Sequence, residues 1–174
     1  MISSRLLVIA LIVGLPSALE GQIVLERTSC FGTCPAYRLT VRSDGGVIFI
    51  GRNSFAVDSG SKKIESRVVD SLTNQLIRSG FLALADSYHR EGAGCVVWGT
   101  DQPTIVLKVR KDSVQKTVSY DLGCFGDSLP KDRDAAFRIL DNPPASRTLI
   151  QELAAAVDSA VGVAQWLRLP RSRH

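Results

Sequence analysis

The sequence predicts an α+β domain in which an antiparallel sheet of two hairpins carries helices on one face. Segments 37–51 and 104–120 each have the pattern of two strands about a turn. Between them, apolar residues recur at every fourth position over 64–76, which is the period of an amphipathic helix. Hairpins separated by a helix are typical of one antiparallel sheet with helices packed on a single face.

The first hairpin follows a strand that we predict over 22–28. Apolar and polar residues alternate over 37–41, as in a half-buried strand, and the return strand covers 47–51. Asp44-Gly45-Gly46 lies between these strands and favours a turn, because glycine accepts positive φ angles.

A short strand over 53–58 and a break at Gly60-Ser61 lead to the predicted helix. Ser61 or a neighbour caps the start of this helix, and Gly80 ends it. Beyond the helix, we expect an irregular, glycine-rich connection over 86–101. The apolar face of the helix consists of Ile64, Val68, Val69, Leu72 and Leu76.

Two more helices follow the second hairpin. Pro143-Pro144 separates them, because proline cannot continue a helix. Trp166 is expected to pack the end of the chain onto the body of the domain. The predicted elements are strands over 104–109 and 114–120 about a turn near 111–113, a helix over 132–140, and a last helix that starts at Ser146 or Thr148.

The N-terminus has the pattern of an export signal. Arg5 gives a positive start, and the apolar run Leu6–Leu15 follows. This run fits the roughly 7–15 apolar residues of a secretory signal and is shorter than the roughly 20 of a membrane span. We predict that residues 1–21 are a signal peptide cleaved after Gly21, with cleavage after Ala18 as the alternative. A buried element at the start of a cytosolic domain is the competing interpretation.

Removal of the signal leaves a single α+β domain over 22–167 and a basic tail over 168–174. This length is enough for one domain with a proper core. The net charge of +4 is modest, and a short basic terminus is typical of a solvated chain end. Nucleic-acid binding requires a larger basic cluster with aromatic partners, so we predict no nucleic-acid partner. We also predict no membrane span after signal removal, and a periplasmic or extracellular location.

Four cysteines remain after signal removal, and three pairings are possible. The second hairpin brings Cys95 and Cys124 to the same end of the sheet, which favours a Cys95–Cys124 disulfide. Cys30 and Cys34 then form a local staple of the turn before strand 37–41. The other pairings, such as Cys30–Cys124, remain alternatives.

Thiol–disulfide exchange through Cys30 and Cys34 is the alternative to a structural staple. Reactive cysteine pairs have two intervening residues and lie at a helix N-terminus, which lowers the thiol pKa. Here three residues intervene, and Pro35-Ala36-Tyr37 continues into a predicted strand. A structural role is therefore the preferred interpretation.

Recognisable catalytic and metal-binding patterns are absent from the sequence. The two histidines, His89 and His174, are far apart, so we predict neither a metal site nor another cofactor. Ser59-Gly60-Ser61-Lys62 matches a Ser-x-x-Lys pattern without its partner motifs and is interpreted as a loop and helix cap. Asp132 and Asp134 complement a helix dipole. No catalytic residue is predicted, and the sequence favours a protein that is not an enzyme.

Tyr37, Trp98 and Asp101 are the candidate recognition residues. Trp98 lies in a glycine-rich loop and is the best candidate for an exposed aromatic contact, although packing is the favoured interpretation. Tyr37 fits a half-buried strand position, and Asp101 fits a turn that leads into the strand at 104.

An opening motif is formed by Cys30-Phe31-Gly32-x-Cys34-Pro35-x-Tyr37, Leu39-Thr40-Val41, Asp44-Gly45 and Val47-Ile48-Phe49-x-Gly51. This motif resembles domain-of-unknown-function family 6438. Members of that family are bacterial exported or lipoprotein-type proteins, so the resemblance implies bacterial export and supports the domain boundary, without any activity. Cys95 and Cys124 are additional to the family motif. The resemblance extends from this motif through Phe81, Tyr88, Thr100-Asp101-x-Pro103 and the second hairpin to the helix before Trp166, and so covers most of the mature chain.

Three functional hypotheses follow from the sequence. The first is a non-catalytic, exported binding module that uses its sheet to engage a protein, peptide or cell-envelope component. The second is a thiol–disulfide redox protein acting through Cys30 and Cys34. The third is a hydrolase that uses scattered polar residues, which a deep polar pocket would support.

Overall fold

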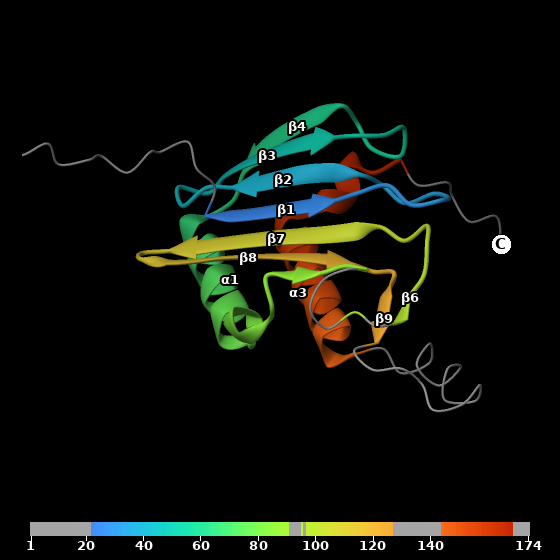
Figure 1. Ribbon diagram of the computed structural model, residues 1–174. Helices are drawn as coiled ribbons and strands as arrows, with labels where there is room; N and C mark the ends of the chain where they lie inside the picture. The colour runs from blue at the N-terminus through green and yellow to red at the C-terminus, as the bar shows by residue number, and fades with distance from the viewer. Residues whose placement is uncertain (1–21, 91–94, 96, 127–143, 169–174) are drawn as a thin grey trace, which may run out of the picture.

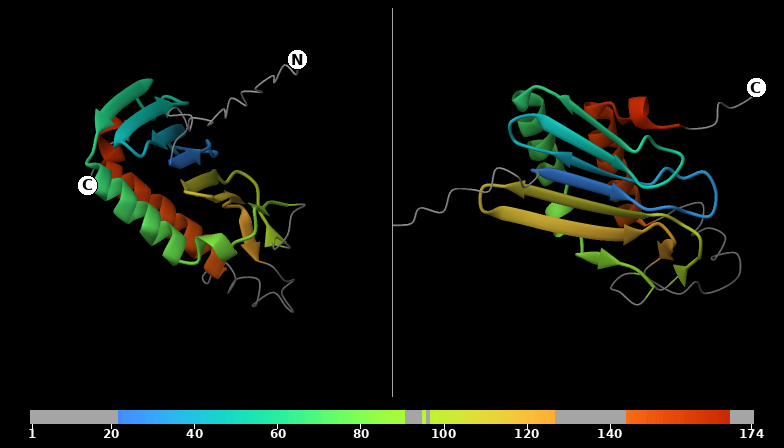
Figure 2. Two further views of the ribbon diagram at one scale, coloured as in Figure 1. Left: turned by 90° about the vertical axis from the view of Figure 1, so that its left-hand side faces the viewer. Right: turned by 90° about the horizontal axis from the view of Figure 1, so that it is seen from above.

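A mixed seven-stranded sheet backed by two helices forms the body of the protein. The structure, a computed structural model, describes residues 22–90, 95, 97–126 and 144–168. Figure 1 and Figure 2 show both helices on one face of the sheet, so the predicted α+β class is confirmed. Across the sheet the strands are β4 (Ser59–Lys63), β3 (Gly46–Gly51), β2 (Tyr37–Val41), β1 (Ile23–Arg27), β7 (Thr104–Lys111), β8 (Val114–Asp121) and β5 (Ser87–Tyr88).

The two predicted hairpins are parts of a larger arrangement. Strands β1 to β4 form an antiparallel meander, and β7 and β8 form the second hairpin. Strand β1 joins the two units, because it pairs with β2 on one side and with β7 on the other. At one edge, β5 pairs with β8 in parallel, in a segment where an irregular connection was predicted. The sheet is therefore mixed, and a description as two hairpins is incomplete.

The strand predicted over 53–58 is displaced in the structure. Within that range only Ala56 has a strand-like contact, an isolated bridge to Leu167, whereas β4 occupies Ser59–Lys63. The sequence predicts a chain break at Gly60-Ser61 and a loop and helix cap over 59–62, and the segment Ser59–Lys63 has no apolar residue that would indicate a strand. It pairs with β3 at the sheet edge, where exposed lysines discourage pairing with another chain.

The helical layer contains α1 (Ser66–Arg78) and α3 (Ala145–Val161). Glu65 is the N-cap of α1 in place of the predicted Ser61, and Gly80 follows the helix at φ 95°, a conformation that glycine readily adopts. Helix α3 begins after Pro144, before the predicted Ser146 or Thr148. It ends at Gly162, which has φ 72° and donates its amide to Asp158 and Ser159 carbonyls.

The core lies between the sheet and the helices. Tyr37 stacks on Phe49 and Phe49 on Trp166, with ring centroids 5.2 and 4.9 Å apart. Trp166 lies in a 3₁₀ turn, η2 (Val163–Trp166), and packs the chain end onto the sheet as predicted. A Cβ at Gly60 would lie 2.3 Å from the Trp166 Nε1, so glycine permits this packing. Each fully buried Leu, Val or Phe side chain in the core contributes roughly 1.5–3 kcal/mol.

A small two-stranded sheet lies beside the main one. Strand β6 (Val97–Trp98) pairs with β9 (Cys124–Gly126), and both lie at the end of the β7–β8 hairpin. The predicted signal at 1–21, the predicted helix over 132–140, with Asp132 and Asp134, and the tail beyond Arg168 lie outside the described residues. Among the described residues, no helix is long and apolar enough to cross a membrane.

Candidate functional site

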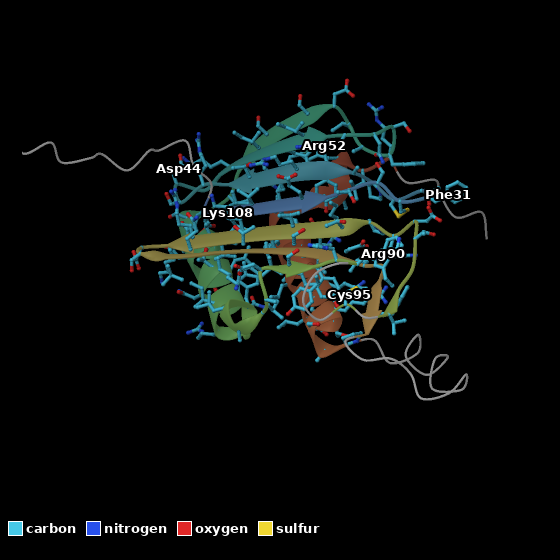
Figure 3. The ribbon with its side chains drawn as sticks, viewed as in Figure 1. Phe31, Asp44, Arg52, Arg90, Cys95 and Lys108 are labelled. Atoms are coloured by element: carbon cyan, nitrogen blue, oxygen red, sulfur yellow. A yellow bond between two sulfur atoms is a disulfide. The ribbon has the colours of Figure 1, made fainter. Side chains whose placement is uncertain are left out.

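The loop between β1 and β2 is closed by the Cys30–Cys34 disulfide and presents one large apolar side chain. The two Cα atoms are 5.6 Å apart. At the tip of this loop Phe31 is 89% exposed, more than any other large apolar residue that the structure describes (Figure 3). Gly32 follows with φ 139°, a conformation that a side chain would strain. The disulfide therefore holds an aromatic ring in solvent, at a fixed place on the molecule.

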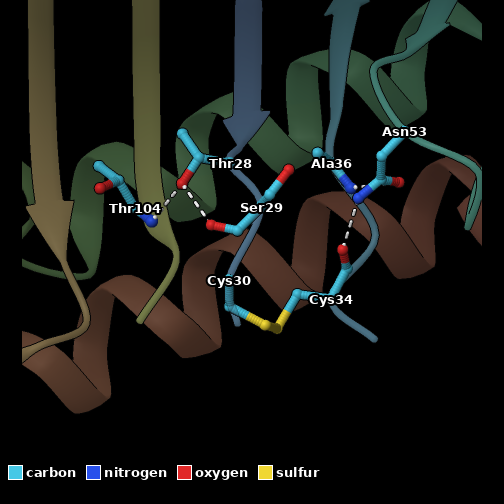
Figure 4. Close-up of a disulfide and its surroundings, with 7 residues drawn as sticks. All are labelled: Thr28, Ser29, Cys30, Cys34, Ala36, Asn53 and Thr104. Atoms are coloured by element: carbon cyan, nitrogen blue, oxygen red, sulfur yellow. Dashed lines mark hydrogen bonds between the residues drawn. A yellow bond between two sulfur atoms is a disulfide. The ribbon is translucent and has the colours of Figure 1, made fainter. Parts of the chain in front are cut away.

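Asn53 fixes the second half of this loop through its side-chain amide. The Nδ2 group donates to the Cys34 carbonyl at 2.8 Å, and the Oδ1 atom accepts from the Ala36 amide at 3.2 Å (Figure 4). The same Oδ1 atom also accepts from the Phe55 amide at 3.2 Å. These bonds satisfy backbone groups that the sheet does not pair. The sequence placed Asn53 only at the start of a short strand, because an asparagine gives no signal for such a long-range role.

The first half of the loop is tied to the connection that precedes β7. The Thr28 hydroxyl accepts from the Thr104 amide at 2.7 Å, and the Thr28 amide donates to the Thr104 carbonyl at 3.0 Å (Figure 4). Farther out, the Phe31 amide donates to the carbonyl of Asp101 at 3.2 Å. Asp101, a candidate recognition residue, is exposed and has φ 67°. Phe31 and Asp101 therefore belong to one surface.

A polar cluster of Arg27, Tyr37 and Asp158 lies behind the loop and joins β1 and β2 to α3. The Tyr37 hydroxyl donates to Asp158 Oδ1 at 2.6 Å and accepts from Arg27 Nε at 2.8 Å. Arg27 Nη2 donates to Asp158 Oδ2 at 2.8 Å, and its Nε also lies 3.1 Å from that oxygen. The side chains of Arg27 and Asp158 are only 23% and 22% exposed. Such charge-assisted bonds are stronger than bonds between neutral groups.

Electrostatics keep this cluster in one protonation state. Burial, the largest single influence, would lower the pKa of Arg27, but the electrostatic interactions with Asp158 and Tyr37 and the hydrogen bonds to both side chains together outweigh it and raise that pKa. Burial and the negative charge of Asp158 also raise the pKa of the Tyr37 phenol above its ordinary value. At neutral pH the cluster therefore holds one positive charge, one negative charge and a neutral phenol.

The cluster and the loop enclose a pocket of about 400 Å³. Its polar groups come from the cluster and from Thr28 and Thr33, and apolar side chains form the remaining wall. Mostly apolar concave sites with a few convergent polar groups are typical of ligand pockets. The residues that line it are Arg27, Thr28, Thr33, Cys34, Pro35, Tyr37, Pro103, Ile105, Asp158 and Leu167.

The second disulfide, Cys95–Cys124, lies in a different environment. Cys124 is fully buried and Cys95 is 6% exposed, so this bond belongs to the core. Beside it in β6, Trp98 is half-buried, donates its Nε1 hydrogen to Asp121 at 2.9 Å, and carries Arg90 over its ring at 5.1 Å. Trp98 thus has the packed environment that the sequence favoured.

The predicted site residues therefore divide between two places. Tyr37 and Asp101 lie at the end of the molecule that carries Cys30 and Cys34, whereas Trp98 lies near Cys95 and Cys124. Both disulfides have the pairing that the sequence favoured. Among the described residues, no three His, Cys, Asp or Glu side chains are grouped closely enough to hold a metal ion.

Sequence reasoning missed Arg27 and Asp158. Arg27 continues the core-facing series of Ile23 and Leu25, where a charged residue requires a buried partner. Asp158 follows the buried Val157 in α3, 131 positions away along the chain. The unusual position of Arg27 was a usable signal, whereas its partner could be identified only from the fold.

Comparison with known proteins gives a family and no activity. Residues 21–142 match the family described as Domain of unknown function (DUF6438). The match includes Arg27, Tyr37 and all four cysteines, and it ends before α3 and Asp158. No curated protein matches the sequence at a significant level.

Proposed function

We propose a function from the site alone, because the chain belongs to the family Domain of unknown function (DUF6438). We infer that the protein is an exported, non-catalytic binding module of the cell envelope. Its partner is a protein, peptide or other envelope component, held at the pocket and at Phe31. The observation that carries this proposal is the pocket of about 400 Å³ next to an aromatic ring that is 89% exposed and covalently positioned. Exposed aromatic anchors are typical of recognition surfaces.

The chemistry of the pocket supports binding over catalysis. The side chains of Tyr37, Asp158 and Arg27 are hydrogen-bonded to one another. Arg27 compensates the charge of Asp158, so this carboxylate is poorly suited to act as a general base. Among the described residues of the lining there is no serine, histidine or free thiol that could serve as a nucleophile.

Export is supported by the apolar N-terminal segment and by the two disulfides. Disulfides persist in oxidising compartments, so the bonds are consistent with an extracytoplasmic protein. We propose residues 1–21 as the signal peptide, 22–167 as the domain and 168–174 as the basic tail. Intact-mass measurement of protein recovered from the native host should give the chain without residues 1–21. Retention of the N-terminus would overturn this part of the proposal.

Site-specific photo-crosslinking in the native host tests the binding surface. A photoreactive p-benzoylphenylalanine placed at Phe31 should give a discrete crosslinked species. The same residue at Ile48, which is 43% exposed on the sheet face away from the helices, is the matched control and should not. No adduct from position 31, or equal adducts from both positions, would rule out this surface as the binding site.

Thiol–disulfide exchange through Cys30 and Cys34 is the alternative function. One observation favours it: both cysteines are only half-buried, in an exposed loop. Against it, the next element after Cys34 is strand β2, so no helix dipole is available to stabilise a thiolate. A bridge that is reduced reversibly by a mild dithiol in the folded protein would support this alternative, and resistance to it would exclude it.

A further inference from the structure

We propose that the pocket binds a neutral apolar side chain of an extended peptide, whose adjoining backbone carbonyl accepts hydrogen bonds from Arg27. This inference rests on the proposed binding function and names the chemical class of the ligand. It is carried by the shape of the apolar wall, by the unused donors of Arg27 and by the charge balance of the cluster.

The wall of the pocket suits an aliphatic side chain. Pro35 and Pro103 face it with rigid rings and Leu167 adds branched apolar surface, while the fully buried Ile105 lies behind them. Burial of such a side chain removes apolar area from water on both partners, which is favourable. A polar side chain in this position would lose its hydration without gaining a partner from the wall.

Arg27 offers hydrogen-bond donors that no described residue uses. A guanidinium group has five N–H donors. The single Nε hydrogen is shared between Tyr37 and Asp158, and one Nη2 hydrogen goes to Asp158. The other three N–H groups, one on Nη2 and two on Nη1, make no hydrogen bond with any group that the structure describes. The polar side of the pocket is therefore rich in donors, which suits a ligand with a hydrogen-bond acceptor.

Charge decides which acceptor fits. Asp158 compensates the charge of Arg27, and the phenol of Tyr37 is neutral, so the cluster has no net charge. A bound carboxylate would leave one negative charge unbalanced in a partly buried site, which costs binding free energy. A neutral carbonyl oxygen accepts the same hydrogen bonds without that cost.

The position of Phe31 favours a peptide over a free small molecule. Phe31 is outside the set of residues that line the pocket, yet its loop contributes Thr33 and Cys34 to that lining. A ligand that contacts both the pocket and Phe31 must extend beyond the pocket. An extended peptide does so, because its side chains recur at about 3.3 Å per residue along the chain.

NMR titration of the oxidised, ¹⁵N-labelled protein with three small probes tests this inference. N-acetyl-leucinamide carries the apolar side chain and neutral carbonyls, N-acetyl-leucine adds a carboxylate, and N-acetyl-glycinamide lacks the side chain. Fragments of this size bind in the millimolar range. At pH 7 we expect the leucinamide to shift amides around the pocket, such as those of Thr33 and Ile105. The acid should bind at least about fivefold more weakly, and the glycinamide should produce no saturable shift.

The variant Asp158→Asn sharpens the test, because it leaves Arg27 uncompensated. In this variant the acid should overtake the amide, whereas Ile48→Ser on the opposite sheet face should preserve the order of the parent protein. If Asp158→Asn does not fold, the three probes on the unmodified protein still decide the question.

Each remaining outcome overturns the inference. Equal or stronger binding of the acid to the unmodified protein would reject the neutral ligand, although the pocket would still be a binding site. Equal binding of the glycinamide would reject the apolar side chain. No pocket shifts with any probe would reject the peptide ligand, and crosslinking at position 31 would then judge the proposed function independently.

Discussion

The two disulfides, Cys30–Cys34 and Cys95–Cys124, differ in burial and in the length of chain that they close. Cys95–Cys124 spans 29 positions and is buried in the core, where it joins β9 to the segment before β6. Cys30–Cys34 spans 4 positions in a loop that leaves Phe31 in solvent. The difference indicates that the buried bond serves stability, whereas the exposed bond closes a surface loop, which is the loop that we propose as the binding site.

Hydrogen bonding reinforces this contrast. The Cys30–Cys34 loop is held by Asn53 on one side and by Thr28 on the other, and both contacts fix backbone without covering Phe31. Near the other disulfide, Trp98 donates a hydrogen bond to Asp121, and Arg90 lies over its ring. The aromatic side chain of Trp98 is therefore packed against its neighbours. Of the two aromatic residues, Phe31 is the more exposed, since Trp98 is half-buried.

The largest expected effect is on the buried disulfide. The double variant Cys95→Ala/Cys124→Ala should lose about 3–4 kcal/mol of the free energy of unfolding, because the long loop is no longer closed in the unfolded chain. Urea denaturation monitored by circular dichroism measures this loss. A loss below about 1 kcal/mol would remove the distinction between the two bonds.

A smaller loss of stability is expected from the exposed disulfide. Cys30→Ala/Cys34→Ala removes a disulfide that closes a shorter loop, and should cost about 2 kcal/mol in the same denaturation experiment. Binding should suffer more than stability, because Phe31 and the pocket lose their fixed geometry. If the variant binds N-acetyl-leucinamide as the parent protein does, the loop is not a positioning device.

Alkaline pH should reveal the buried Tyr37. Its pKa is raised in the folded protein, so above about pH 10 the unfolded chain releases a proton that the folded protein retains. The folding free energy contributed by Tyr37 is therefore fully present below pH 10 and declines as pH rises. Urea denaturation between pH 9 and 11 should show an extra loss of up to about 1.4 kcal/mol per pH unit in the parent protein, relative to Tyr37→Phe. Identical pH profiles would indicate that the phenol is accessible to solvent.

The smallest effect is expected for Asn53→Ala, at about 1–2 kcal/mol of unfolding free energy. The cause is the loss of three bonds to the backbone around Cys34. Asn74→Ala is the matched control, since the Asn74 side chain accepts a single hydrogen bond among the described residues, from Lys111. Thermal denaturation of both variants measures the difference, and a larger effect at Asn74 would contradict the assigned role of Asn53.

Much of the fold could be predicted because its strongest elements have local signals. Apolar and polar residues alternate over 37–41, and apolar residues recur at every fourth position in α1. In both elements the apolar side chains are those buried against the neighbouring layer. The polar β4 and the two-residue β5 had no such signal, since backbone pairing at the sheet edges defines them. Helices and strands were therefore predictable where side-chain burial determines them. Strands that are determined only by backbone hydrogen bonding were not.

The candidate site could be predicted only in part. Its cysteines, Tyr37 and Asp101 are visible in the local sequence, because turns and disulfides restrict residue type. The contribution of Asp158 could not be predicted, because it depends on how α3 crosses the sheet beside Arg27. Phe31 was part of the recognised motif, but its exposure follows from the loop geometry alone.

The central claim is that the Cys30–Cys34 loop presents Phe31 to a partner, and crosslinking from position 31 tests it most directly. The yield of the adduct should be compared among the parent protein, Cys30→Ala/Cys34→Ala and Cys95→Ala/Cys124→Ala, each normalised to the amount of folded protein. We predict that the adduct is lost with the exposed disulfide and kept with the buried one, although the buried one contributes more stability. Loss of the adduct only with Cys95–Cys124, or the same yield in all three proteins, would contradict this account.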